Sequence, residues 1–194
     1  ILNLRYTKGF DSFLDGFFDY QKIEASVSQS FFTKNFGKTR YHLQAGYVDT
    51  DVPLGLLFTG EGSNDDDIPI VMHDTFQTML PYEFLSDQYV NLFLTHDLGS
   101  LLFKTENFNP GIIIHHDMGW GDLENPESHL WDFKTKDKIF IESGLEVTKL
   151  VKLNYLDAFY LSFGVGAFYR YGDYSFDKSS DNFVFKLNTT FSLN

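Results

Sequence analysis

The chain contains, at residues 182–194, the stretch NFVFKLNTTFSLN. Odd positions in this stretch are mainly apolar and even positions are mainly polar. The odd set is Phe183, Phe185, Leu187, Thr189, Phe191 and Leu193; the even set includes Asn182, Lys186, Asn188, Thr190 and Ser192. Because successive side chains of a strand point to opposite faces, the stretch predicts a β-strand with one apolar face. A terminal strand of this kind is typical of outer-membrane β-barrels.

Seven more stretches alternate with the same period of two residues. The eight predicted strands cover residues 1–8, 20–32, 39–48, 88–97, 110–119, 139–148, 158–171 and 182–193. We therefore predict an all-β fold, an antiparallel transmembrane β-barrel, with residues 1–194 forming its C-terminal portion. Since residue 1 already lies in a strand pattern, we expect the chain to be the C-terminal part of a longer one.

Charged residues in the predicted strands share one face. Ten of eleven take the parity opposite to the apolar set, and only Lys8, at a strand end, does not: the ten are Arg5, Lys22, Glu24, Arg40, Asp97, Asp117, Glu142, Glu146, Arg170 and Lys186. A charge facing lipid at the midplane costs about 2–4 kcal/mol, so a barrel would turn these residues into its lumen. A soluble antiparallel barrel or sandwich also alternates, with charges outward, and parity alone leaves that alternative open.

The connections also differ in length and charge. Four longer ones, residues 9–19, 49–87, 120–138 and 172–181, hold 20 acidic residues and 4 Lys, whereas 33–38, 98–109 and 149–157 hold 5 Lys and 2 acidic residues. The barrel rule places the first group outside the cell and the second in the periplasm. We expect the acidic loops to meet lipopolysaccharide and the apolar strand faces to meet outer-membrane lipid.

Composition excludes several other classes of protein. The net charge of −12 argues against a nucleic-acid partner, and the absence of Cys excludes disulfides and thiolate metal sites. The mean hydropathy is −0.21, and no run approaches the ~18 apolar residues of a membrane helix. The aromatic content of 18% suits the interfacial girdles of a barrel.

Four segments resemble an outer-membrane family of the Bacteroidota that joins a carboxypeptidase-regulatory-like domain to a C-terminal barrel. They are LNLRYTKGF (2–10), FDYQKIEASVSQSF (18–31), TMLPYEFLSDQYVNLFLTHD (78–97) and LNYLDAFYLSFGVGAFYRYG (153–172). That family is in turn similar to surface-antigen barrels of assembly and secretion, which have sixteen strands. The resemblance implies that the eight strands are the last eight of about sixteen and that residues 49–87 are a long extracellular loop folded toward the lumen.

In the surface-antigen barrels, an Arg-Gly-aromatic loop tip docks against an Asp-x-Gly pattern on the barrel wall. Here the wall pattern is present as Asp117 and Gly119, but the tip, Gly60, Glu61 and Gly62, lacks Arg. We expect the loop to dock near Asp117, through backbone amides or a basic lumen residue such as Arg40. The further lumen candidates for docking are Glu142, Glu146, Arg170 and Lys186.

Other polar clusters are candidates for a catalytic site or a metal site. His115 and His116 are adjacent on a strand, so they cannot share one metal ion. The carboxylates of Asp65, Asp66 and Asp67 could hold a divalent cation, although a solvated loop is the commoner outcome. An outer-membrane protease could use residues from the set His73, Asp74, Glu83, Asp87 and His129; a lipase could use Ser143 with His116.

No nucleophile-elbow pattern accompanies these residues. We therefore expect a non-enzymatic barrel without a cofactor in the bacterial outer membrane, serving transport, assembly or scaffolding together with other envelope proteins. The enzyme alternative, a protease or lipase, stays open, as does a scaffold with a sealed lumen. The balance of five basic and five acidic lumen charges favours salt bridges that hold a loop over an open, ion-selective pore.

Overall fold

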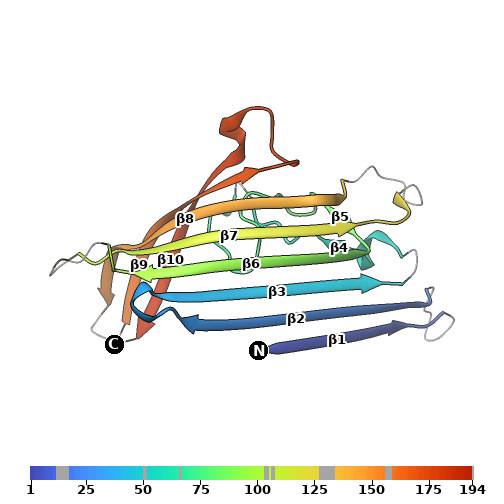
Figure 1. Cartoon of the computed structure of the whole chain (residues 1–194), viewed down its shortest axis with the longest axis horizontal. Helices are drawn as coiled ribbons and strands as arrows, with labels where there is room; N and C mark the ends of the chain where they lie inside the picture. The colour runs from blue at the N-terminus through green and yellow to red at the C-terminus, as the bar shows by residue number, and fades with distance from the viewer. Residues whose placement is uncertain are drawn as a thin grey trace.

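The computed structural model describes residues 1–11, 18–49, 52–65, 67–102, 105, 108–126, 134–155 and 159–193. Eight strands form one antiparallel sheet in the order β1-β2-β3-β6-β7-β8-β9-β10 (Figure 1). Their bounds are Leu2–Gly9 (β1), Tyr20–Phe32 (β2), Lys38–Val48 (β3), Gln88–Gly99 (β6), Gly111–Asp122 (β7), Lys136–Tyr155 (β8), Phe159–Tyr171 (β9) and Phe183–Leu193 (β10). The predicted all-β, antiparallel fold is confirmed.

One predicted connection is wrong. Residues 149–155, assigned to a turn, belong to β8, which runs on to Tyr155. The register of β8 against β9 shifts between Val147 and Val151, and Lys149 takes a positive φ of 58°. This bulge interrupts the alternation while the strand continues, so the sequence pattern placed the strand end too early. The strand before β8, β7, runs on to Asp122 and so includes Trp120, which was expected in a loop.

The sheet is strongly curved but does not close on itself. Among the eight strands of the sheet, β1 pairs only with β2 and β10 pairs only with β9, so both are edge strands. In Figure 1, β9 and β10 turn at a steep angle to β1–β7, and the segment between β3 and β6 lies behind β6 to β8. That segment contains η2 (Leu54–Leu56), β4 (Phe58–Thr59) and β5 (Leu85–Ser86).

The two faces of the sheet differ in polarity in the opposite sense from those of a soluble protein, with charged side chains on the inner face and apolar side chains on the outer face. The inner face, which carries the segment between β3 and β6, contains the charged residues, and Glu142 and Glu146 there are 0% exposed. The outer face carries the apolar set, with Leu4 at 75% and Phe185 at 71% exposure. The predicted facing of the charges relative to the apolar residues is therefore present in the sheet, and the main hydrophobic clusters lie between its inner face and the covering segment.

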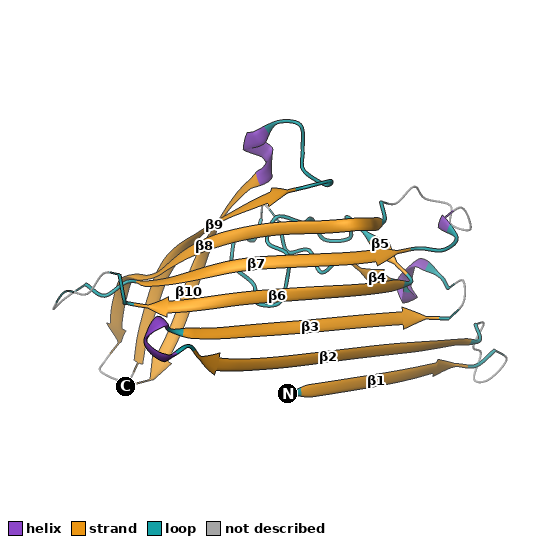
Figure 2. Ribbon diagram, viewed as in Figure 1, coloured by secondary structure: helices purple, strands orange, loops and turns teal. Residues whose placement is uncertain are grey.

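Among the described residues, helical structure is limited to short 3-10 turns, such as Lys34–Phe36 (η1) and Ser179–Asn182 (η4) (Figure 2). In the part of the chain that the structure describes, no helix is long and apolar enough to cross a membrane.

Phe168 of β9 packs closely against Gly144 of the neighbouring strand β8. A Cβ atom added to Gly144 would lie 2.1 Å from Phe168 Cδ1, and one added to Gly166 would lie 2.7 Å from Phe168 Cε2. Phe168 is 1% exposed, so its ring has no free space into which to retreat. The two glycines therefore let an aromatic ring fill the inner face where a larger residue would not fit.

We predict that Gly144→Val destabilises the protein by about 1–3 kcal/mol, because the ring must leave a closely packed site. The measurement is the urea midpoint of unfolding in detergent. The matched control is Gly55→Val, since a Cβ at Gly55 meets nothing within 4 Å. Equal midpoints for the two variants would contradict the packing described.

Candidate functional site

The most elaborate site is the contact between the inner face and the segment that covers it. We call residues 52–87 the docked loop; residue 66 within it lies outside the described residues. β4 and β5 pair at its base, with Phe58 opposite Ser86 and Thr59 opposite Leu85. The loop is therefore a long hairpin extension that leaves β3, lies across the inner face and returns to β6.

Glu142 of β8 is the central attachment point of the docked loop. Its carboxylate accepts hydrogen bonds from the backbone N–H of Gln77 at 2.6 Å and of Thr78 at 2.9 Å. The Thr78 hydroxyl donates a third at 2.5 Å. Since a buried carboxylate is costly unless its oxygens are hydrogen-bonded, the two loop amides compensate for the burial of Glu142. Neither group is satisfied without the other.

Two bidentate ion pairs hold the loop at other points. Arg40 donates to both carboxylate oxygens of Asp74, at 2.7 and 2.6 Å. Arg170 donates to both oxygens of Glu83, at 3.1 and 2.8 Å, and both side chains are nearly fully buried. Burial alone would raise the pKa of Asp74, but the hydrogen bonds and charge of Arg40 hold it below its usual value. Each pair joins one cation of the eight-stranded sheet, which we call the wall, to one loop anion.

Lysines of the inner face bind carbonyl groups of the loop. Lys186 Nζ donates to Ser63 O at 2.6 Å and to Ser63 Oγ at 2.9 Å, and it is buried. Lys22 Nζ donates to Leu56 O at 3.0 Å. Together with the two Arg residues, these contacts extend from β2 to β10, so the loop is attached across most of the width of the sheet.

An aromatic cluster packs between the loop and the wall. Phe76, Met79 and Phe84 of the loop pack with Phe93 and Phe140 of the wall, and all five are buried. The Phe76 ring lies 4.9 Å from that of Phe93 and 5.0 Å from that of Phe140. The docking contact therefore combines apolar burial with the ionic attachments.

The two residues of the wall pattern differ in their contacts: Gly119 lies against the docked loop, whereas Asp117 binds within the wall. A Cβ on Gly119 would lie 2.6 Å from Phe76 Cζ, so the glycine leaves room for the loop's aromatic ring. Asp117 is buried and accepts a hydrogen bond from Leu94 N–H in the wall at 3.2 Å. The loop amides bind Glu142, which is opposite Asp117 in the register, and Arg40 binds Asp74.

The remaining docking candidates likewise divide into residues that contact the loop and residues that bind within the wall. Arg170 and Lys186 contact the loop, whereas Glu146 accepts from Asn188 Nδ2 at 2.6 Å and pairs with His115 within the wall. The tip Gly60, Glu61 and Gly62 packs on the loop's own returning segment. Phe76 N–H donates to Glu61 O at 2.9 Å, and Gly62 bridges to Phe76.

Glu61 is half-buried and takes a positive φ of 57°. Burial raises the pKa of its carboxyl group, partly offset by the positive charge of Lys136. The ionised form is therefore less favourable in the docked loop than in water.

Among the described residues, the proposed metal ligands and the proposed protease residues do not form one cluster. Asp65 is exposed and accepts from Asp67 N–H, while Asp66 lies outside the described residues. Within the described ranges, no three His, Cys, Asp or Glu side chains are arranged as a metal site. His115 lies on the inner face and His116 on the outer face, as their parity predicts.

Of the protease set, Asp74 and Glu83 are held in ion pairs with Arg40 and Arg170, and His129 falls among residues that the structure does not describe. On the outer face, His116 Nδ1 lies 2.9 Å from Ser143 Oγ, which is 3.0 Å from the Tyr171 hydroxyl. The backbone around Ser143 in β8 is engaged in sheet pairing with the neighbouring strands β7 and β9. The three side chains thus satisfy one another, without a free pair of amides to receive an oxyanion.

Comparison with protein families, with curated proteins and with solved structures found no match to this chain.

Neither Lys136 nor the loop residue of each attachment was predicted from the sequence to take part in this contact. Lys136 is 1% exposed; its Nζ donates to Asn91 Oδ1 at 2.9 Å and lies 4.8 Å from the centre of the Phe76 ring. It shares the parity of Glu142, which could have identified it had β8 been extended to its true start. For Asp74 and Glu83, the sequence offers no local signal that separates them from the other loop acids.

We predict that Glu142→Ala releases the docked loop, because two buried amides lose their acceptor at a cost of about 3 kcal/mol. Cleavage by chymotrypsin should accelerate at least about tenfold; trypsin is unsuitable because residues 52–87 contain no Lys or Arg. Glu24→Ala is the control, since Glu24 pairs with Arg5 of β1 and not with the loop. Unchanged cleavage of Glu142→Ala would show that this carboxylate does not hold the loop.

A second prediction follows from Glu61. An acid whose pKa is raised by folding destabilises the folded state above that pKa, and the cost disappears below the unfolded value of 4.5. Glu61→Gln should therefore slow hydrogen exchange at the Phe76 amide at pH 7. At pH 4, after correction for intrinsic exchange, the variant and the parent should differ much less. A benefit of equal size at both values would rule out burial of the ionised carboxylate as its cause.

Proposed function

We propose that this chain forms part of a transmembrane β-barrel in the bacterial outer membrane, with a lumen closed by the docked loop. The observation that carries the proposal is the reversed polarity of the sheet. Six charged side chains on the inner face, Asp117, Lys136, Glu142, Glu146, Arg170 and Lys186, are buried, while apolar side chains cover the outer face. An exposed apolar surface of this extent is stable in hydrocarbon and unfavourable in water.

Strand length supports the same proposal. β6 and β7 each contain 12 residues, which rise about 40 Å at the spacing of an extended chain. Tilted by about 40°, such strands span about 30 Å, close to the hydrocarbon thickness of a bilayer.

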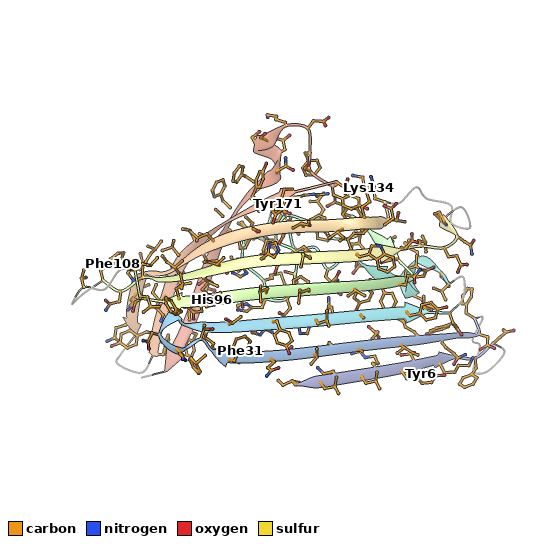
Figure 3. The ribbon with its side chains drawn as sticks, in the orientation of Figure 1. Tyr6, Phe31, His96, Phe108, Lys134 and Tyr171 are labelled. Atoms are coloured by element: carbon orange, nitrogen blue, oxygen red, sulfur yellow. The ribbon has the colours of Figure 1, made fainter. Side chains whose placement is uncertain are left out.

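Aromatic side chains occur near both ends of the strands (Figure 3). Tyr6 lies near one end of β1 and Phe31 near the opposite end of β2. Both have outer-face parity and both are exposed. Aromatic residues at the two edges of an apolar band are typical of membrane interfaces.

The docked loop also bears on barrel size. An eight-stranded barrel has an interior just wide enough for its own side chains. Here the inner face carries a segment with its own strand pair and a cluster of five buried residues, Phe76, Met79, Phe84, Phe93 and Phe140. A lumen that holds this segment needs more than eight strands, which favours the expected barrel of about sixteen. The resemblance to the Bacteroidota family stays a prediction and is compatible with that size.

We assign the barrel a non-enzymatic role in transport, outer-membrane assembly or scaffolding, with outer-membrane lipid, lipopolysaccharide and other envelope proteins as its surroundings. Three of the six buried charges, Glu142, Arg170 and Lys186, bind the loop, so part of the polar surface that would line a pore is used to hold a plug. A plug attached by several separate polar contacts suits a channel that opens under a defined stimulus or a barrel that serves as a sealed platform.

Conductance of the full-length protein in planar bilayers tests this function. We predict that the parent protein stays closed and that replacing residues 61–83 by a short Gly-Ser turn opens a conducting lumen. The turn can follow directly on the pairing of Thr59 with Leu85. Tyr82→Gly is the control, because Tyr82 is exposed and makes none of the attachments described.

Resistance to carbonate extraction establishes membrane insertion in each sample. A protein that is carbonate-soluble would contradict the barrel. An inserted deletion variant that does not conduct would contradict the plug.

A further inference from the structure

The edge of β10 that does not pair with β9 is partly covered by the docked loop. Leu187 N–H donates to Pro69 O at 2.7 Å, and Val71 N–H donates to Leu187 O at 2.9 Å. We call residues 68–71 the edge segment. The N–H and C=O of Leu187 therefore point away from β9 and into the position that a next strand would take.

The edge segment runs parallel to β10, with Ile70 opposite Leu187. Every neighbouring pair in the eight-stranded sheet is antiparallel. The edge segment is also short, since its two bonds to β10 both involve Leu187. It covers an exposed edge without having the direction or the length of a wall strand.

We propose that the edge of β10 is the surface at which a further antiparallel strand of the barrel wall pairs, and that the edge segment holds this surface until that strand displaces it. The inference rests on the proposed function. The incoming strand has alternating polarity, with apolar residues beside Phe185 and Leu187 on the outer face and polar residues beside Lys186 on the inner face.

The attachments of the loop permit this exchange. Lys186 holds Ser63 from the inner face, where a neighbouring strand does not interfere. The bonds from Leu187 lie in the plane of the sheet and are incompatible with such a neighbour. Ile68 and Ile70 are exposed, so no tight packing opposes their departure. The edge segment can thus leave β10 while the rest of the loop stays docked.

Thiol crosslinking of the full-length protein tests the exchange. The chain contains no Cys, so Ile70→Cys with Leu187→Cys gives one reactive pair in these 194 residues. The matched control is Val165→Cys with Leu187→Cys, because these two residues are opposite each other on β9 and β10. A short bifunctional methanethiosulfonate is added during refolding, before insertion, and again after insertion into vesicles of outer-membrane lipid.

We expect the Ile70–Leu187 pair to link before insertion and to lose at least 90% of its crosslinking in the carbonate-resistant fraction. The Val165–Leu187 pair should link in both states. Undiminished linking of Ile70–Leu187 in the carbonate-resistant fraction, or no linking in either state while the control links, would overturn the exchange. Absence of any carbonate-resistant fraction would overturn the barrel itself, so the two failures are distinguishable.

Discussion

A charged side chain that leaves water must find a partner of opposite charge or a set of hydrogen bonds, and this constraint governs the inner face of the sheet. Glu142 takes its partners from loop amides, Arg170 takes Glu83, and Lys186 takes carbonyl and hydroxyl oxygens of Ser63. Without the docked loop these groups would lose those partners. Wall and loop are therefore stable only together.

The same constraint explains the outer face. Once the charges and the aromatic cluster are turned inward, most of the remaining side chains of each strand are apolar, and many of them, such as Leu4 and Phe185, are exposed. Hydrocarbon is the environment in which such a surface costs least. The proposed barrel and the proposed plug are thus two consequences of a single partition of polarity across one layer of strands.

Alternation in the sequence was sufficient for the strands and for the facing of their charges, because the period of two residues is a local property. The bounds of β2 were predicted as observed, whereas β8 was cut short by the bulge at Lys149. The partners of the charges were beyond prediction. Asp74 and Glu83 are ordinary loop acids until the fold brings them to Arg40 and Arg170, and no local pattern indicates that Glu142, opposite Asp117, receives the loop amides.

Spin labels placed one at a time along β10, from residue 183 to residue 191, test the partition of polarity most directly. In vesicles, odd positions such as Phe185 and Leu187 should collide with dissolved oxygen far more often than with a water-soluble nickel reagent. Even positions such as Lys186 and Asn188 should be protected from both. Odd positions that are accessible to the nickel reagent, or a profile without a period of two residues, would contradict a lipid-facing outer surface.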